Sequence, residues 1–222
     1  MLQLRMFRLF MIISLFYLYA DALVIKKHPI DYFKRDRMVL TKAYIESHYG
    51  ISARNASIEP KIIVIHATGI DDLNATINTF MGARLPHSRK DIANGGSLNV
   101  SAHFVVDRDG TVYQLMHERQ MARHVIGLNY NSIGIENIGG VDHKEDLTPE
   151  QLRANAELVE YLSEKHEELT YLIGHHEYRC FEGHELWLER DANYRTVKKD
   201  PGEKFMAALH AEIGSLERAP CE

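Results

Sequence analysis

The sequence predicts an α/β protein with a single mixed β-sheet flanked by helices. Short apolar runs rich in β-branched residues alternate along the chain with segments of helical periodicity, and this pattern is typical of a sheet covered by helices. The chain has 222 residues, a length that suits one domain with a sizeable core. A formal net charge of -5 without a basic stripe argues against a nucleic-acid partner.

The first 22 residues have the features of a secretory signal peptide. Two arginines precede an apolar run over Leu9–Ala20, and the small-x-small pattern Ala20-Asp21-Ala22 follows. The alternative is an uncleaved membrane anchor, but the run is shorter than the roughly 20 residues that a spanning helix needs. We therefore expect a secreted or periplasmic protein with no stable membrane anchor after cleavage.

Residues 23–60 are interpreted as an N-terminal extension that wraps a core domain formed by residues 61–222. The core begins with Ile62–Ile65, a continuous β-branched run typical of a buried strand. The remaining expected elements are an amphipathic stretch over Met38–His48, a helix over Asp72–Met81, a loop over Leu85–Leu98, and strands over His103–Val106, Thr111–Leu115, Ser132–Ile138 and Tyr171–Ile173.

Turn and cap residues mark several boundaries between these elements. Asp107–Gly110 has the composition of a hairpin turn. Thr148–Gln151 carries a threonine N-cap, a proline at N1 and a glutamine at N3, so it predicts a helix that runs to about Glu168. The dipeptide Asp200-Pro201 predicts a second helix start of the same kind, with a helix that runs to about Ile213.

Thirteen histidines are a high count, and they prompt a search for a metal site. His66 ends the first buried strand, and His175 follows the end of another; strand ends are where α/β sheets present catalytic groups. Asp200 precedes a proline, where an aspartate is usually a helix cap. Two imidazoles and a carboxylate are also a donor set for zinc that leaves a fourth position open. Spacing alone does not decide between these interpretations.

Five blocks, in order, resemble the type 2 N-acetylmuramoyl-L-alanine amidases, relatives of the peptidoglycan recognition proteins and phage amidases. They are similar to the family's first ligand strand, central hairpin, glutamate strand, second ligand and Lys-x-Asp-Pro-Gly block. In this sequence the blocks are Ile63–His66, Ser101–Gly110, Ser132–Glu136, Gly174-His175 and Lys198–Gly202. The resemblance spans Lys61 to Phe205, about two thirds of the chain.

The resemblance implies a Zn2+ site and makes residues 61–222 a zinc amidase domain. Its ligands would be His66, His175 and Asp200. His176 competes with His175 for the same position. Because neighbouring strand residues face opposite ways, only one of the two reaches the metal, and the family pattern selects the one after glycine.

The resemblance also assigns catalytic and substrate-binding roles. Glu136 would be the general base that moves a proton from water to the leaving amine. Lys198 would stabilise the oxyanion of the tetrahedral intermediate. Alone, Glu136 is compatible with a surface strand position and Lys198 with a solvated basic pair. Similar proteins have a histidine at the position of His124 in the substrate cleft, so His124 is a candidate substrate contact.

The implied activity is zinc-dependent hydrolysis of the amide bond between N-acetylmuramic acid and L-alanine in peptidoglycan or muropeptides. Three other functions stay open. A recognition module without activity is disfavoured by the filled ligand positions, and a cytoplasmic recycling amidase by the signal peptide. A metallohydrolase that acts on an unrelated amide is not excluded. We expect a monomer, because nothing in the sequence indicates an interface.

Cys180 and Cys221 are the two cysteines of the chain. In an oxidising compartment such a pair often forms a disulfide. The alternative is two free thiols, and the export signal favours the bridge.

Overall fold

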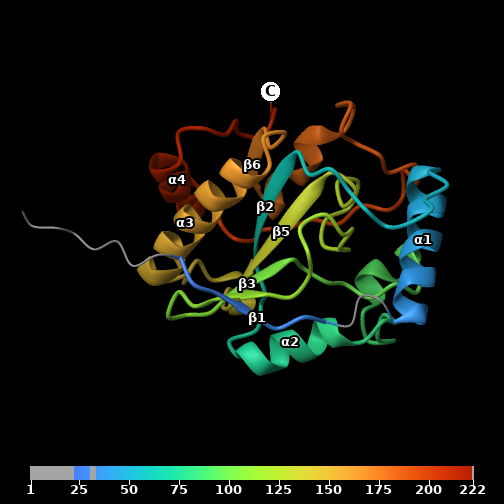
Figure 1. The fold of residues 1–222 in the computed structure, drawn as a ribbon, viewed down its shortest axis with the longest axis horizontal. Helices are drawn as coiled ribbons and strands as arrows, with labels where there is room; N and C mark the ends of the chain where they lie inside the picture. The colour runs from blue at the N-terminus through green and yellow to red at the C-terminus, as the bar shows by residue number, and fades with distance from the viewer. Residues whose placement is uncertain (1–22, 31–33, 222) are drawn as a thin grey trace, which may run out of the picture.

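The apolar runs of the sequence pair into one mixed six-stranded sheet within the described part of the chain (Figure 1). The structure is a computed structural model, and it describes residues 23–30 and 34–221. The signal peptide predicted for residues 1–22 lies outside these residues. The strands are β1 (Ile25–Lys27), β2 (Ile62–Ala67), β3 (Phe104–Val106), β4 (Val112–Gln114), β5 (Ser132–Asn137) and β6 (Tyr171–Gly174).

The strands lie in the order β1-β4-β3-β5-β2-β6. β3 and β4 form the predicted antiparallel hairpin, and every other neighbouring pair runs parallel. This arrangement confirms the predicted single mixed sheet flanked by helices. It also places the carboxyl ends of β2, β5 and β6 at one edge of the sheet.

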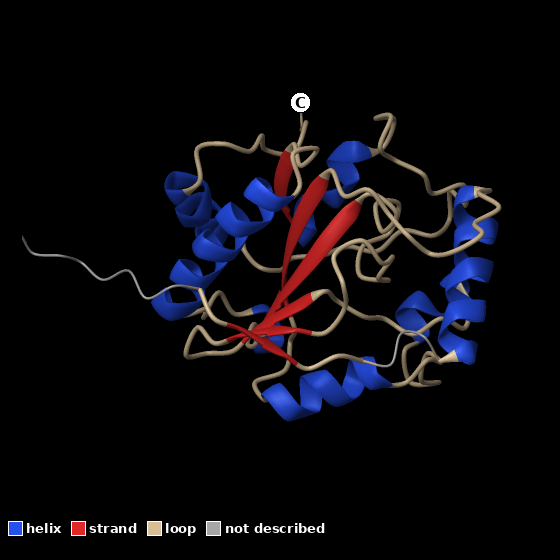
Figure 2. Ribbon diagram, in the orientation of Figure 1, coloured by secondary structure: helices blue, strands red, loops and turns tan. Residues whose placement is uncertain are grey.

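Helices cover both faces of the sheet (Figure 2). On one face, α3 (Pro149–Lys165) and α4 (Glu203–Glu212) pack against alternate residues of the central strands. On the other, α1 (Arg35–Tyr49) and α2 (Leu73–Met81) contribute to a second core. In β2, Ile63 and Ile65 belong to the first core, whereas Ile62 and Val64 belong to the second, as strand alternation requires.

The predicted extension contributes elements to the same sheet and core. Its short strand β1 pairs in parallel with β4 and aligns Ile25 with Val112. Helix α1 is longer than the predicted stretch over Met38–His48, and it buries Tyr44 and Ile45 in the second core. The predicted loop over residues 85–98 contains a short 3-10 helix, Lys90–Gly95.

The capping box of α3 forms as predicted. The Thr148 hydroxyl accepts the backbone N–H of Gln151 at 3.1 Å, and the Gln151 side chain accepts the backbone N–H of Thr148 at 2.9 Å. The helix ends at Lys165, three residues before the predicted Glu168.

The predicted start of the last helix at Asp200-Pro201 is wrong. Helix α4 begins at Glu203, and its N-cap is Gly202 with φ 107°, a conformation that favours glycine. The Asp200-Pro201 peptide bond is cis. The Asp200 carboxylate lies 3.0 Å from Nδ1 of His175, so the side chain is engaged there and does not cap the helix.

The two cysteines form the predicted disulfide. Cys180 and Cys221 have Cα atoms 4.8 Å apart and are bonded to each other. The bridge ties the end of the chain to the 3-10 helix His175–Phe181, which follows β6.

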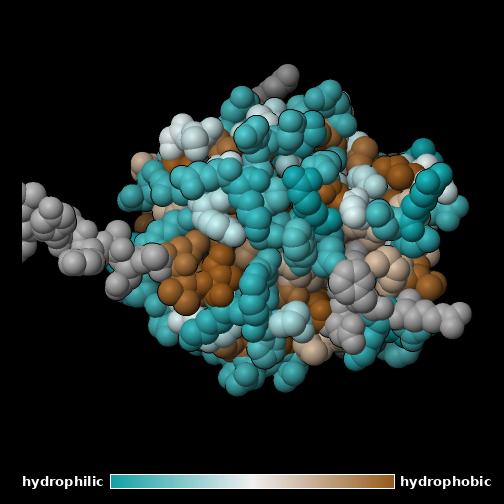
Figure 3. Space-filling model, in the orientation of Figure 1, coloured by the Kyte–Doolittle hydropathy of each residue, from teal (hydrophilic) through white to brown (hydrophobic). Residues whose placement is uncertain are grey.

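The outer surface is mainly polar on the face that Figure 3 shows, and its apolar side chains form separate patches there. Among the described residues, no helix combines the length and the apolar character needed to cross a membrane.

Candidate active site

Three of the predicted site residues meet because their strands run parallel. In the register of β2 and β5, His66 pairs with Glu136. In the register of β2 and β6, Ile65 pairs with Gly174, and His175 follows directly. Parallel strands end at the same edge of a sheet, so segments far apart in sequence deliver their side chains to one place. Asp200 joins them from the loop before α4.

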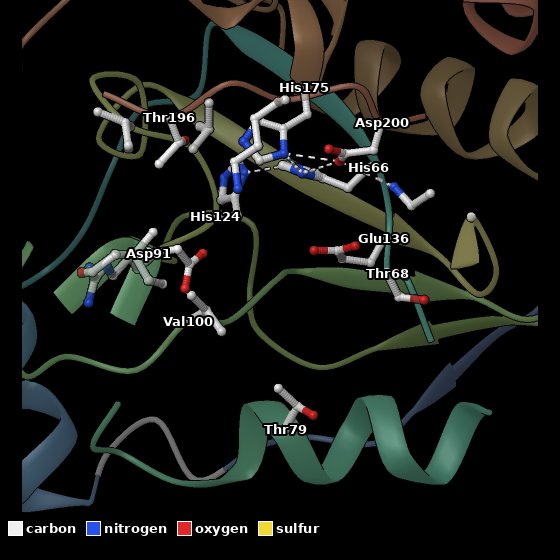
Figure 4. A pocket seen from close by; sticks show the side chains of 18 of the residues that line it. His66, Thr68, Thr79, Asp91, Val100, His124, Glu136, His175, Thr196 and Asp200 are labelled. Carbon is white, nitrogen blue, oxygen red and sulfur yellow. Dashed lines mark hydrogen bonds and ion pairs between the residues drawn. The ribbon is translucent and has the colours of Figure 1, made fainter. Parts of the chain in front are cut away.

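The side chains of His66, His175 and Asp200 converge on one point (Figure 4). Nδ1 of His66 lies 2.9 Å from Nδ1 of His175 and 3.5 Å from Oδ2 of Asp200. Nδ1 of His175 lies 3.0 Å from the same carboxylate oxygen. Among the described residues, this is the one group of three or more histidine, cysteine or acidic side chains with ligand atoms this close.

These distances and atom types fit a zinc ion. A tetrahedral zinc with bonds of about 2.0–2.1 Å separates its ligand atoms by about 3.3–3.4 Å, and the three observed distances bracket this value. Two imidazole nitrogens and one carboxylate oxygen are common zinc donors, and three protein ligands leave a position for water or substrate.

The protonation of the cluster suits a cation. Burial, assisted by the charge of His175, lowers the pKa of His66 to about 4, so its ring is neutral near pH 7. Burial alone would raise the pKa of Asp200, but its contacts with His175 and His66 hold it well below the ordinary value. A neutral ring and an ionised carboxylate are the states in which these groups bind metals.

The side chain of His176 lies outside this cluster and contacts the backbone of Asp200. Both the backbone N–H and Nδ1 of His176 contact the Asp200 carbonyl oxygen, at 3.0 and 3.1 Å. The structure therefore places His175 in the cluster and gives His176 a contact with the Asp200 backbone, which the sequence did not suggest.

Glu136 lies beside the cluster, and one of its carboxyl oxygens accepts no hydrogen bond from the described residues. Its Oε2 atom is buried and has no hydrogen-bond partner among the described residues. Burial and then the charge of Asp200 raise the pKa of Glu136 to about 8, against the opposing effect of Lys198 and Arg89. A carboxyl group with this pKa can exchange a proton near neutral pH, as a general base must.

A pocket of about 430 Å³ opens in front of these residues. Its wall includes the whole cluster, Glu136 and Lys198. Figure 4 shows Glu136 beside the cluster and Thr79 of α2 across the pocket. The charge of Lys198 lowers the pKa of both Glu136 and His66, so this partly exposed ammonium lies within electrostatic reach of both.

A family model described as N-acetylmuramoyl-L-alanine amidase matches residues 56–203, which include every residue of this site. The chain belongs to this amidase family. The endolysins of Escherichia phage T7 and Enterobacteria phage T3 are 38% and 37% identical to it over 86 residues. In each case the match covers 37% of this chain and 56% of the phage protein, so the chain spans about half the length of these curated relatives.

Among solved structures, a selenomethionine derivative of AmpD superposes on this amidase-family chain with a TM-score of 0.51. The two are 21% identical, and the match covers 87% of this chain and 95% of the other. At this identity the likeness shows the fold alone, and it agrees with the mixed sheet described above.

In this amidase-family chain, His124 lines the pocket, but its ring is already engaged. Its Nδ1 lies 2.9 Å from Nε2 of His66, and its Nε2 lies 3.2 Å from the Ser132 hydroxyl. The role of His124 as a substrate contact stays a prediction.

The segment over residues 85–98 borders the pocket. Its Asp91 side chain lies on the pocket wall and forms an ion pair with Arg89, with an Oδ1–Nε distance of 3.1 Å (Figure 4). The side chain that holds this segment in place could not be predicted from the sequence. Buried Arg123 donates hydrogen bonds to the carbonyl oxygens of Ile92, Leu98 and Gly96. Nothing in its local sequence distinguishes Arg123 from a surface arginine.

Proposed function

We propose that this chain is a zinc-dependent N-acetylmuramoyl-L-alanine amidase. It hydrolyses the amide bond between N-acetylmuramic acid and L-alanine in peptidoglycan or muropeptides. The observation that carries the proposal is the convergence of three metal-donor atoms next to the unpartnered carboxylate of Glu136, in the pocket of an amidase-family member.

His66, His175 and Asp200 would hold the zinc ion. Zinc in such a site acts as a Lewis acid toward the scissile carbonyl and makes water more acidic. The chain would hold the two rings and the carboxylate in place before zinc binds. The burial of both histidines supports this role.

Glu136 is the general base of the proposed reaction. It accepts a proton from the attacking water and returns it to the nitrogen of the leaving L-alanine. Burial and the charge of Asp200 raise the pKa of Glu136, so its ionised carboxylate is a stronger base than an ordinary glutamate. No hydrogen bond to Oε2 competes with the water in the described structure.

Lys198 stabilises the negative charge that develops on the carbonyl oxygen. Its ammonium group lines the same pocket, and its field reaches Glu136. A fixed positive group at the place where charge develops lowers the barrier more than it favours the neutral ground state.

The predicted signal peptide supports action outside the cytoplasm. A secreted or periplasmic location would bring a monomeric enzyme to its polymeric substrate, and the proposed partner is the cell wall itself.

Digestion of purified peptidoglycan tests the proposal. The full chain should release stem peptides with a free L-alanine N-terminus, which mass spectrometry identifies, and chelation should stop the release. Binding to peptidoglycan without release, also after zinc is added, would show the recognition module instead. Hydrolysis of simple amides but not of peptidoglycan would indicate a metallohydrolase with another substrate.

A further inference from the structure

One face of strand β5 carries three residues, and two of them contact His124. Residues 132, 134 and 136 of β5 share a face because side chains alternate along a strand. Ile133 and Ile135 point to the opposite face, into the core with α3 and α4. Ser132 contacts the His124 ring, Gly134 lies against it, and Glu136 lines the pocket.

Gly134 makes room for the imidazole of His124. A Cβ atom at this position would lie 2.7 Å from both Cγ and Nδ1 of that ring, closer than side-chain contacts allow. Any larger residue would therefore displace the ring from His66. The glycine is required by a close approach here, because its backbone is an ordinary part of strand β5.

The directions of the hydrogen bonds around His124 follow from the Leu128 carbonyl oxygen. The carbonyl oxygen of Leu128 can only accept, so the Ser132 hydroxyl, 2.8 Å away, donates to it. The Ser132 oxygen then accepts from Nε2–H of His124 at 3.2 Å. That leaves Nδ1 of neutral His124 as an acceptor.

The next link reaches the metal cluster. Nδ1 of His124 lies 2.9 Å from Nε2 of His66, so it accepts the Nε2–H of that ring. The proton of His66 is thereby held on Nε2, and the lone pair on Nδ1 points at His175 and Asp200. A partner on the far nitrogen is the usual device that fixes the tautomer and orientation of a ligand histidine.

We propose that His124 is a positioning residue for His66, anchored by Ser132, rather than a group that contacts substrate. The inference rests on the proposed zinc site and concerns how the chain prepares it. Both ring nitrogens of His124 are engaged within the protein, so neither is free to bind a sugar or a peptide.

Zinc affinity of the full chain tests this inference without any activity assay. Competition against a chromophoric chelator should show Ser132→Ala and His124→Leu binding zinc about 10–100-fold more weakly than the parent. His124→Asn keeps an oxygen acceptor near the position of Nδ1, so it should recover much of the affinity. The visible spectrum of the Co2+ form should change in His124→Leu and stay near that of the parent in His124→Asn.

The matched control is His166→Asn. His166 is another buried histidine, at the end of α3, and neither of its ring nitrogens has a partner within the described structure. This substitution should leave zinc affinity unchanged even if it lowers the melting temperature. Thermal melts of all variants in zinc-free buffer show which of them are folded.

The outcomes separate this inference from the proposed function. If the parent binds zinc no better than His66→Ala, the zinc site is wrong, and the inference is overturned with it. If the parent binds zinc tightly and Ser132→Ala and His124→Leu bind it equally well, only the inference is overturned. Equal losses in His124→Leu and His124→Asn, or a loss in His166→Asn, would attribute the effect to packing and also overturn it. A raised KM with unchanged zinc affinity would return His124 to the predicted substrate contact.

Discussion

His66 and Glu136 are paired in the register of the parallel strands β2 and β5. A metal-donor nitrogen and an unpartnered carboxylate oxygen therefore line one pocket, placed by the backbone pairing of the sheet. The relative placement of His66 and Glu136 is thus set by the pairing of two central strands. This relationship lets the roles of metal binding and proton transfer be tested independently.

Glu136→Gln should keep the fold and the zinc ion but lose turnover. Glutamine is nearly isosteric with glutamate, but it cannot accept the proton of water. We expect hydrolysis of peptidoglycan to fall by at least roughly 10²–10⁴-fold, the range typical of general acid–base catalysis. Metal content, a melting curve and a hydrolysis rate are measured on one sample, and peptidoglycan binding should persist. A variant that holds zinc and hydrolyses at near the parent rate would show that Glu136 is not the base.

His66→Ala and Asp200→Ala should each lose bound zinc, because two protein ligands hold this metal poorly. Dialysis against a chelator should likewise abolish activity of the parent, and added zinc should restore it. Metal analysis after gel filtration checks both statements. His176→Ala is a useful comparison, since its ring contacts the Asp200 backbone rather than the proposed zinc position, and its loss should weaken zinc binding less. Full activity in a rigorously metal-free preparation would refute the zinc requirement.

The sequence predicted the strand ends of the site because local patterns determine them. Ile62–Ile65 is apolar and β-branched whatever its neighbours are, and its end places His66 correctly. Asp200 was harder to interpret, because an aspartate before proline looks the same whether its carboxylate caps a helix or contacts a distant histidine. The contact with His175, 25 residues away, decides between the two, and no local pattern records it.

Long-range contacts also explain the other differences. The contact between His124 and His66 joins residues 58 positions apart, so resemblance placed the ring in the cleft without revealing its partner. Strand β1 has three residues and no strong apolar pattern, and it exists because its backbone pairs with β4. The burial of Arg123 likewise depends on the segment that it holds.

Removal of the disulfide should destabilise the chain without abolishing activity. The bridge closes a loop across a sequence separation of 41 residues, for which loop entropy suggests roughly 4 kcal/mol of stabilisation. Cys221→Ser should therefore lower the melting temperature. Activity at 25 °C should persist, because neither cysteine lines the pocket. Reductant should lower the melting temperature of the parent to that of the variant and leave the double variant Cys180→Ser/Cys221→Ser unchanged. The prediction is wrong if Cys221→Ser melts at the same temperature as the parent and reductant does not lower the melting temperature of the parent.

His103 should make the stability of the fold sensitive to acid. Its ring is fully buried; Nε2–H donates to the Gln120 carbonyl oxygen at 2.8 Å, and Nδ1 accepts the Gly134 N–H at 2.9 Å. Only the neutral ring can make both contacts, and burial lowers the pKa of His103 to about 4. Above the ordinary pKa of about 6.5 the ring is neutral in both the folded and unfolded states.

As pH falls from about 6.5 to 4, the unfolded chain takes up a proton that the folded chain does not. The free energy of unfolding should therefore decrease over this window, by roughly 3 kcal/mol for this one group. His103→Gln removes the group that titrates, so its deficit relative to the parent should shrink as pH is lowered. Urea unfolding of the chelator-treated proteins at pH 7, 5.5 and 4.5 measures that difference, and the comparison cancels contributions from the other histidines. A deficit for His103→Gln that stays constant from pH 7 to 4.5 would mean that His103 does not remain neutral in the folded protein.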